Sequence, residues 1–178
     1  ILCFESTTKY KEWDIEDINF SRTICDFISI SIETNQRIEA EHQLAYKSSL
    51  LSAITTITNN FLINNKLDET TDETLRIIGK AAKVDRVHFF VSDNDKKTIT
   101  LQNEWVNDGI ESQKNNSGLV NYPHEGFKNL IEILKQNKEY SFLVKNLKDD
   151  QPRNSLEERN IKSLLRLPVM VNNELYGF

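Results

Sequence analysis

Few residues in this chain have types and spacing that suit catalytic chemistry. Two cysteines, Cys3 and Cys25, stand without the C-x-x-C spacing of a zinc or redox site. His42 follows Glu41 in a polar stretch, where an exposed helical position is the simplest interpretation. The sequence also lacks a glycine-rich phosphate loop, a Gly-x-Ser-x-Gly elbow and a His-Glu-x-x-His motif. We therefore expect no catalytic residue, no metal site and no cofactor, and we do not expect an enzyme.

The composition is that of a folded, acidic chain without the features of a nucleic-acid or membrane protein. Its 178 residues are 38% hydrophobic and 28% charged, with a formal net charge of −5, which fits a globular protein and excludes general disorder. Lysine and arginine are scattered, so we expect no nucleic-acid partner. The apolar runs are too short to cross a bilayer. We expect no direct membrane contact and a cytoplasmic location, although other segments of a parent protein could anchor it in a membrane.

The first third of the chain predicts helix. Apolar residues recur at helical spacing over Ile18–Ile32 and again over Leu50–Phe61. Asp14 is the expected N-cap. No Gly or Pro occurs between there and Ile63, so one helix of roughly 75 Å is allowed at 1.5 Å per residue. The alternative is a helix pair that folds back near Thr34–Glu41, and the sequence leaves both arrangements open.

The remaining two thirds predict strands and helices in an antiparallel arrangement. Alternating residues, a turn at Asn172-Asn173 and helical apolar spacing define the elements. In chain order they are a helix near Leu75–Ala82, strands Arg86–Ser92 and Thr98–Val106, a loop Asn107–Glu125, a helix over Phe127–Leu134, a strand Tyr140–Val144, a short helix after Ser155, a strand Ser163–Val171 and a last strand ending at Phe178. This order indicates an α+β fold.

Several short segments resemble the GAF domain family of bacterial signal-transduction proteins. They are Leu2-Cys3-Phe4-Glu5, Trp13, Glu16-Asp17-Ile18, Asp85-Arg86-Val87, Glu104-Trp105-Val106, and Leu167-Pro168-Val169 with Tyr176-Gly177-Phe178. The hairpin that ends at Phe178 and the segment around Trp13 are the more specific parts. The PAS fold, which shares an antiparallel sheet, is the second choice. The resemblance implies an α+β fold with a GAF-like antiparallel sheet and flanking helices.

The resemblance also implies an unusual order of GAF parts along the chain. Residues 1–33 resemble the C-terminal strand and exit helix of one unit, 34–66 a helical linker and entry helix, and 67–178 a core that lacks its final strand. The parts could be two successive units, a permuted sheet completed within the chain, or a swapped sheet completed by a partner chain. We slightly favour pairing within the chain, so we expect the N-terminal segment to supply the closing strand.

In the family, small molecules bind between the sheet and the middle segments, which implies a candidate pocket here. The residues that could line it are His88, Phe90, Glu104, Trp105, Tyr122 and His124. Aromatic walls with a few polar groups suit a small-molecule ligand, although each residue has an alternative role in packing. Arg153, Arg159 and Arg166 could meet an anionic ligand, but a solvated surface is the simpler interpretation.

The function that the resemblance implies is a non-catalytic sensory module of a sensor histidine kinase or diguanylate cyclase. It would bind a small molecule or a partner and pass the change through its helices to an output kinase or cyclase domain. A homodimer through helices or strand exchange is expected. The alternatives are a structural dimerisation or spacer module without a ligand and, least favoured, a thiol enzyme that uses Cys3 or Cys25.

Overall fold

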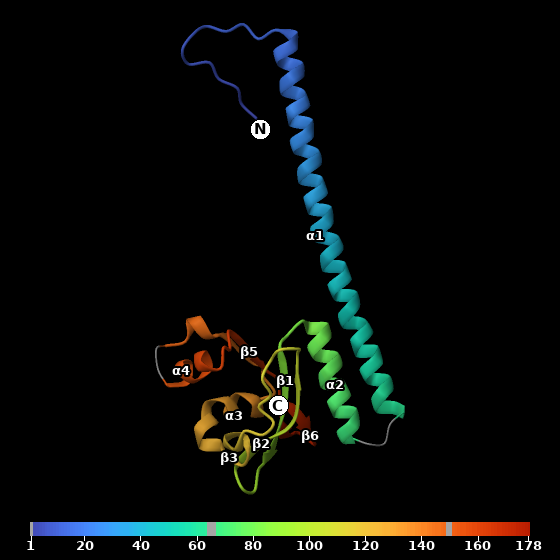
Figure 1. Ribbon diagram of the computed structural model, residues 1–178, viewed down its shortest axis with the longest axis vertical. Helices are drawn as coiled ribbons and strands as arrows, with labels where there is room; N and C mark the ends of the chain where they lie inside the picture. The colour runs from blue at the N-terminus through green and yellow to red at the C-terminus, as the bar shows by residue number, and fades with distance from the viewer. Residues whose placement is uncertain (1, 64–66, 149–150) are drawn as a thin grey trace. The chain divides into compact units, whose positions relative to one another are not determined.

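The computed structural model describes residues 2–63, 67–148 and 151–178. The chain divides into two compact units, one reaching to Ser52 and the other spanning Ala53–Phe178 (Figure 1). Helix α1 spans Ile15–Ile63 and contributes to both units. Within the described ranges, none of the helices combines the length and the apolarity needed to cross a membrane.

Helix α1 is one uninterrupted helix of 49 residues. Asp14 caps it as expected, because its Oδ1 accepts the amide N–H of Asp17 at 2.8 Å. The helix continues through residues 34–41, so the fold-back alternative is not observed. Many of its apolar side chains are exposed, and those over 40% exposed include Ile18, Phe20, Phe27, Ile28, Ile32, Ile38, Leu44, Leu51 and Ile54.

The segment before α1 departs from the sequence-based expectation. Residues 2–14 form neither helix nor strand, so the predicted closing strand is not formed in this chain. Phe4 instead contacts the ring of Trp13 edge to face, with ring centroids 6.3 Å apart. A strand is stabilised by the hydrogen-bonding partner beside it, and the five-stranded sheet described below includes no N-terminal strand. Completion by a partner chain stays a prediction.

The second unit is an α+β domain with an antiparallel sheet, which confirms the predicted fold class. Its elements are α2 (Leu67–Ala82), β1 (Arg86–Asp93), β2 (Thr98–Val106), η1 (Ser117–Leu119), β3 (Tyr122–Pro123), η2 (His124–Phe127), α3 (Lys128–Lys135), β4 (Tyr140–Leu143), η3 (Val144–Asn146), α4 (Gln151–Glu158), β5 (Ser163–Arg166), β6 (Val169–Val171) and β7 (Glu174–Gly177). Five strands form one sheet in the order β3-β2-β1-β7-β6, and β4 pairs with β5 in a second, two-stranded sheet.

The predicted strand Ser163–Val171 is wrong as a single element. It is two strands, β5 and β6, which belong to different sheets. Leu167 and Pro168 separate them, and proline has no N–H to donate to a strand ladder. The break lets β5 leave the large sheet and pair with β4.

Strand β2 contains one residue more than its partner requires. The register shifts between Phe89 and Phe90, which pair with Asn103 and Leu101, so Gln102 has no partner on β1. This is a β-bulge, in which two residues oppose one. The extra residue does not disturb the pairing that follows it, since His88 lies directly opposite Glu104.

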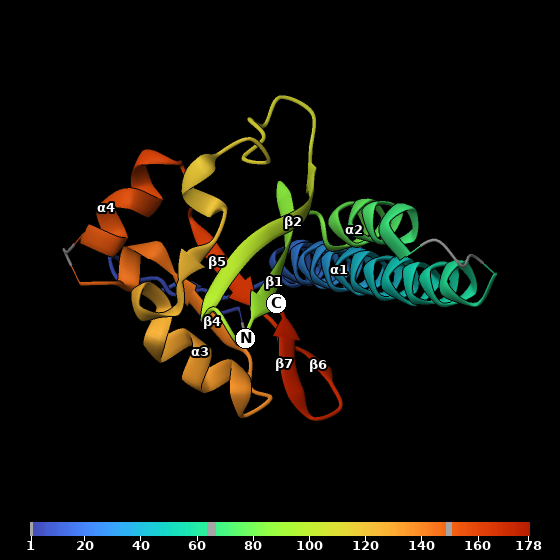
Figure 2. The ribbon, with the colours of Figure 1, turned by 90° about the horizontal axis from the view of Figure 1, so that it is seen from below.

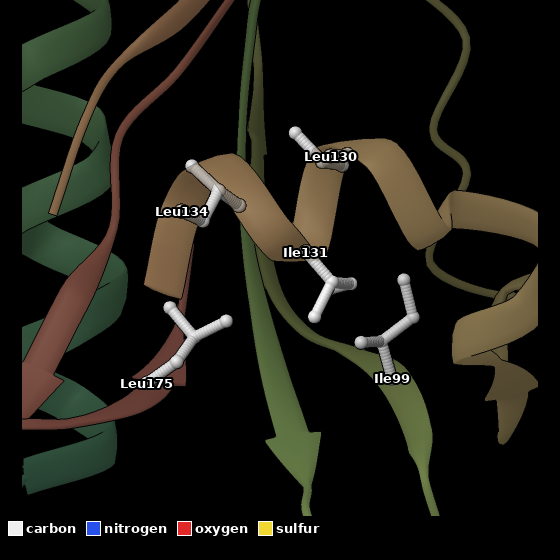
Figure 3. Close-up of a cluster of buried hydrophobic side chains, with 5 residues drawn as sticks. All are labelled: Ile99, Leu130, Ile131, Leu134 and Leu175. Atoms are coloured by element: carbon white, nitrogen blue, oxygen red, sulfur yellow. The ribbon is translucent and has the colours of Figure 1, made fainter. Parts of the chain in front are cut away.

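The two faces of the large sheet are covered by different helices, α2 on one side and α3 on the other (Figure 2). The core on the α3 side consists of Ile99, Leu130, Ile131, Leu134 and Leu175, whose side chains meet between α3 and the strands (Figure 3). Phe178 packs against this cluster. On the α2 side, a Cβ added at Gly79 would lie 2.1 Å from the ring of Trp105, so glycine is what permits the close approach of α2.

Candidate functional site

A histidine and a glutamate meet across the first two strands of the large sheet. His88 on β1 and Glu104 on β2 are opposite partners in the ladder, and His88 Nε2 lies 2.8 Å from Glu104 Oε1. The Glu104 side chain is only 2% exposed and that of His88 is 22% exposed. A buried carboxylate is stable only when donors satisfy its oxygens, so more than the one imidazole is needed.

The loop after β2 supplies the further donors. The amide N–H of Gln113 lies 2.9 Å from each oxygen of Glu104, and the amide N–H of Lys114 donates to Oε2 at 3.1 Å. The Ser112 hydroxyl also donates to Oε2. The loop thus wraps its backbone around the carboxylate, and Glu104 is the anchor that holds it.

Arg86 fixes the same loop from the neighbouring strand. Its Nη2 donates to the carbonyl oxygen of Glu111 at 2.6 Å. Its Nε lies 3.8 Å from Glu104 Oε1, so its positive charge also favours the ionised carboxylate. We call this group the loop anchor. It consists of Arg86, His88, Glu104 and residues 111–114, and it holds the loop against the end of the sheet.

The protonation of the loop anchor follows from these contacts. Burial alone would raise the pKa of Glu104, but hydrogen bonds from Ser112, the Gln113 amide and His88 outweigh it and lower that pKa. Burial lowers the pKa of His88, and its contact with Glu104 compensates only in part, while the positive charges of Arg86 and Arg159 lower it further. The arrangement therefore favours an ionised glutamate beside a neutral histidine.

Phe90 extends the loop anchor toward the core. Its ring meets that of His88 edge to face at 5.5 Å between centroids and stacks on Phe178 at 5.1 Å. Because Phe178 packs on the α3-side core, the rings of His88, Phe90 and Phe178 connect the loop anchor to that core. Three of the candidate residues, His88, Phe90 and Glu104, thus lie together on one face of the sheet.

Trp105 lies on the opposite face. Alternation along β2 turns it away from Glu104 and against Gly79 of α2. Beside it, the Asn103 side chain donates to Asp72 Oδ1 at 2.8 Å. The structure therefore does not bring Trp105 into one cavity with His88, and the ring serves the packing of α2 on the sheet.

Tyr122 and His124 lie near the other end of β2. Tyr122 pairs with Ile99, and its ring lies 4.9 Å from that of Phe127. His124 Nε2 lies 3.1 Å from the carbonyl oxygen of Thr98 and 3.2 Å from Ser92 Oγ. Burial is the main cause that lowers the pKa of His124. The six candidate residues therefore fall into three separate places.

A shallow hollow lies at the β6–β7 hairpin, away from the candidate residues. A hollow of about 180 Å³ is lined by Ser92 and Asn94 and by residues of the β6–β7 hairpin, with none of the six candidates in its wall. Among the described residues, His, Cys, Asp and Glu form no group that could hold a metal ion.

The loop residues Ser112–Lys114 are not singled out by their sequence, because serine, glutamine and lysine carry no pattern that reveals a backbone wrapped around a distant carboxylate.

Comparison with known proteins finds a relative by sequence but no family model. No family model matches the chain. The chain is similar to the methanogenesis regulatory histidine kinase FilI of Methanothrix harundinacea (strain 6Ac), with 31% identity over 143 residues. The match covers 79% of this chain but 16% of that kinase, so the chain corresponds to a small part of it.

Solved structures with a similar fold are GAF domains. The phycoerythrobilin-bound GAF domain of a cyanobacterial phytochrome has a TM-score of 0.59 at 14% identity, covering 74% of this chain and 79% of that one. The GAF domain of a phosphoenolpyruvate-protein phosphotransferase from Coxiella burnetii has a TM-score of 0.55 at 17% identity, covering 73% of this chain and 74% of that one. At these identities the likeness is one of fold.

Proposed function

Because this chain has the GAF fold, we propose that it is a non-catalytic sensory module of a signalling protein of the histidine kinase type. It binds a small molecule at the α3 side of its sheet and passes the change through its helices to a kinase output domain. The observation that carries the proposal is the 31% identity to a regulatory histidine kinase along 79% of the chain. A cytoplasmic location is part of the proposal.

Strand β2 provides the path for the relay. Glu104 holds the long loop on one face, and its neighbours Asn103 and Trp105 contact α2 on the other face. A ligand shifts an equilibrium only when it binds one state better than the other. A ligand that prefers one position of the loop would therefore bias β2 and, through Trp105, the position of α2.

The non-catalytic part of the proposal rests on how the polar groups of the loop anchor are used. The carboxylate of Glu104 already accepts hydrogen bonds from Ser112, Gln113, Lys114 and His88. A general base needs a free lone pair within reach of a substrate proton. Glu104 is committed to structure instead.

A second candidate, a dimerisation or spacer module without a ligand, is favoured by α1. Its exposed apolar side chains include Ile28 at 42% and Ile32 at 52%, which lie one turn apart on the same side of the helix, and grouped exposed apolar side chains are typical of an interaction site. In the first candidate function, the same helix both dimerises and transmits the ligand-induced change to the output domain. Size-exclusion chromatography with light scattering tests the dimer, and a monomer at all concentrations would exclude both helix pairing and strand exchange.

Thermal unfolding in the presence of metabolites separates the two candidates. We expect one class among nucleotides, amino acids, organic acids and tetrapyrroles to raise the Tm by about 5 °C when present at about a hundred times its Kd. Hydrogen exchange should then slow in residues 107–116 and in α2. A dimer that no compound stabilises would reject the sensor and support the spacer.

A further inference from the structure

Arg166 carries a positive charge that no carboxylate of the described chain neutralises. It ends β5, opposite Tyr140 of β4, and its Cζ lies 5.5 Å from the centre of the Phe127 ring. It is half-buried, and burial lowers its pKa. Within the described ranges, no hydrogen bond or ion pair joins Arg166 to an acidic side chain. A desolvated charge without a partner is costly.

Arg159 adds a second positive charge in the same region. Its charge lowers the pKa of both Arg166 and His88, so the three side chains share one electrostatic environment. Arg159 Nε donates to the carbonyl oxygen of Ser155 at 3.0 Å, which leaves its two terminal nitrogens for another acceptor.

Two acidic side chains of the domain are already engaged. Glu104 is enclosed by the loop anchor, and Glu157 on α4 pairs with Arg153 at 2.8 Å. Arg153 is thus a paired residue of the surface, whereas Arg166 departs from the expectation of a solvated surface, because it is half-buried beside an aromatic ring.

We propose that Arg166 binds the anionic group of a small organic ligand, a carboxylate or a phosphate, whose apolar part contacts Phe127 and Tyr140, with the charge of Arg159 adding a weaker attraction. A guanidinium presents two parallel N–H donors that match either anion, and the flanking rings favour a ligand with an apolar or aromatic body. This inference rests on the proposed sensory function and names the chemical class of its ligand.

Titration of the whole chain with benzoate, inorganic phosphate or phenyl phosphate, at ionic strength matched with NaCl, tests the inference. We expect saturable stabilisation by at least one of the three, with phosphate and benzoate alone showing which head group is preferred. Arg166→Met should weaken binding by about tenfold or more, and Arg159→Gln should weaken it less. Arg153→Met is the matched control, because that guanidinium is already paired.

The free protein supplies the second readout. Removing an uncompensated charge should leave Arg166→Met as stable as the parent, or more stable, in anion-free buffer. A less stable Arg166→Met, equal losses in Arg153→Met and Arg166→Met, or no saturable effect of any of the three anions would overturn the inference. If a neutral metabolite stabilises parent and Arg166→Met equally, the anion site is rejected while the sensory function stands.

Discussion

His88 and Glu104 form a cross-strand hydrogen bond of 2.8 Å, and the same carboxylate holds the loop that follows its strand. One buried side chain thus joins β1, β2 and residues 112–114. These contacts depend on the negative charge of Glu104, because hydrogen bonds to an ionised acceptor are roughly twice as strong as neutral ones.

Replacing the carboxylate of Glu104 should release the loop. Glu104→Gln keeps the size of the side chain but turns one acceptor into a donor that faces N–H groups, so we expect a loss of about 2–3 kcal/mol in the free energy of unfolding. Urea denaturation measures it. Glu111→Gln, exposed on the same loop, should change stability by less than about 0.5 kcal/mol. Equal stability of the two variants would contradict the role of Glu104 as anchor.

Acidification should destabilise the domain through His88. Its pKa is lower in the folded state than the ordinary value of 6.5, so the unfolded chain binds the proton more readily. Stability is therefore full above about pH 6.5 and falls as the pH drops toward the folded pKa. Below pH 5 the lowered pKa of Glu104 acts in the same direction.

Urea midpoints measured between pH 7.5 and pH 5, about a unit or more either side of the ordinary histidine pKa, test this dependence. His88→Gln should flatten the pH dependence, and a residual slope is expected from His124, whose pKa is also lowered. The control is His42→Gln, at an exposed position of α1, which should keep the parent slope. If His88→Gln also kept it, burial of the imidazole would not control stability.

The close approach of Gly79 to Trp105 predicts that the effect of Gly79→Ala on stability depends on the residue at position 105. Gly79→Ala improves helix propensity by about 1 kcal/mol, but its Cβ would lie 2.1 Å from the indole ring, and overpacking costs about 1–3 kcal/mol. We expect net destabilisation in the parent. In a Trp105→Leu background the ring is gone, so the same change should be neutral or stabilising. A double-mutant cycle by urea denaturation measures the coupling, and simple additivity would contradict the packing.

Core packing on the α3 side gives the largest expected loss. Leu134 is fully buried, and Leu134→Ala should lower the free energy of unfolding by about 2–5 kcal/mol. Leu165 is 62% exposed, so Leu165→Ala should have an effect below about 0.5 kcal/mol. Thermal unfolding of both variants checks the contrast, and similar losses would mean that α3 does not cover the sheet as described.

Local signals in the sequence predicted the parts of this fold that depend on neighbouring residues. The Asn172-Asn173 turn is one, because both residues have positive φ, 51° and 67°, as a two-residue hairpin turn requires. The alternation of β1 and the N-cap at Asp14 are others. Each is set within a few residues of chain, where turn chemistry and side-chain periodicity act directly.

Features that depend on residues far apart in the chain could not be predicted from local sequence patterns. The strand expected at residues 2–5 had no sheet edge to pair with in its own chain. The predicted strand ran through Pro168, because the pairing of β5 with β4 in a second sheet depends on a strand about twenty residues earlier in the chain. Trp105 and Glu104 were expected to line one pocket, although neighbouring residues of a strand face opposite sides. That Glu104 is enclosed by residues 112–114 follows from the path of a loop, which no residue pattern specifies.

The unpaired Gln102 means that β2 can change length without changing its surfaces. In a regular strand, deletion of one residue would turn every following side chain to the other face. Here the residues on both sides of Gln102 already pair as if it were missing. A chain lacking Gln102 should therefore fold with its His88–Glu104 contact intact, as the slowed exchange of the Gln113 amide would report, whereas deletion of Thr100 should disrupt the sheet. The strand is tolerant of an evolutionary indel at this one position.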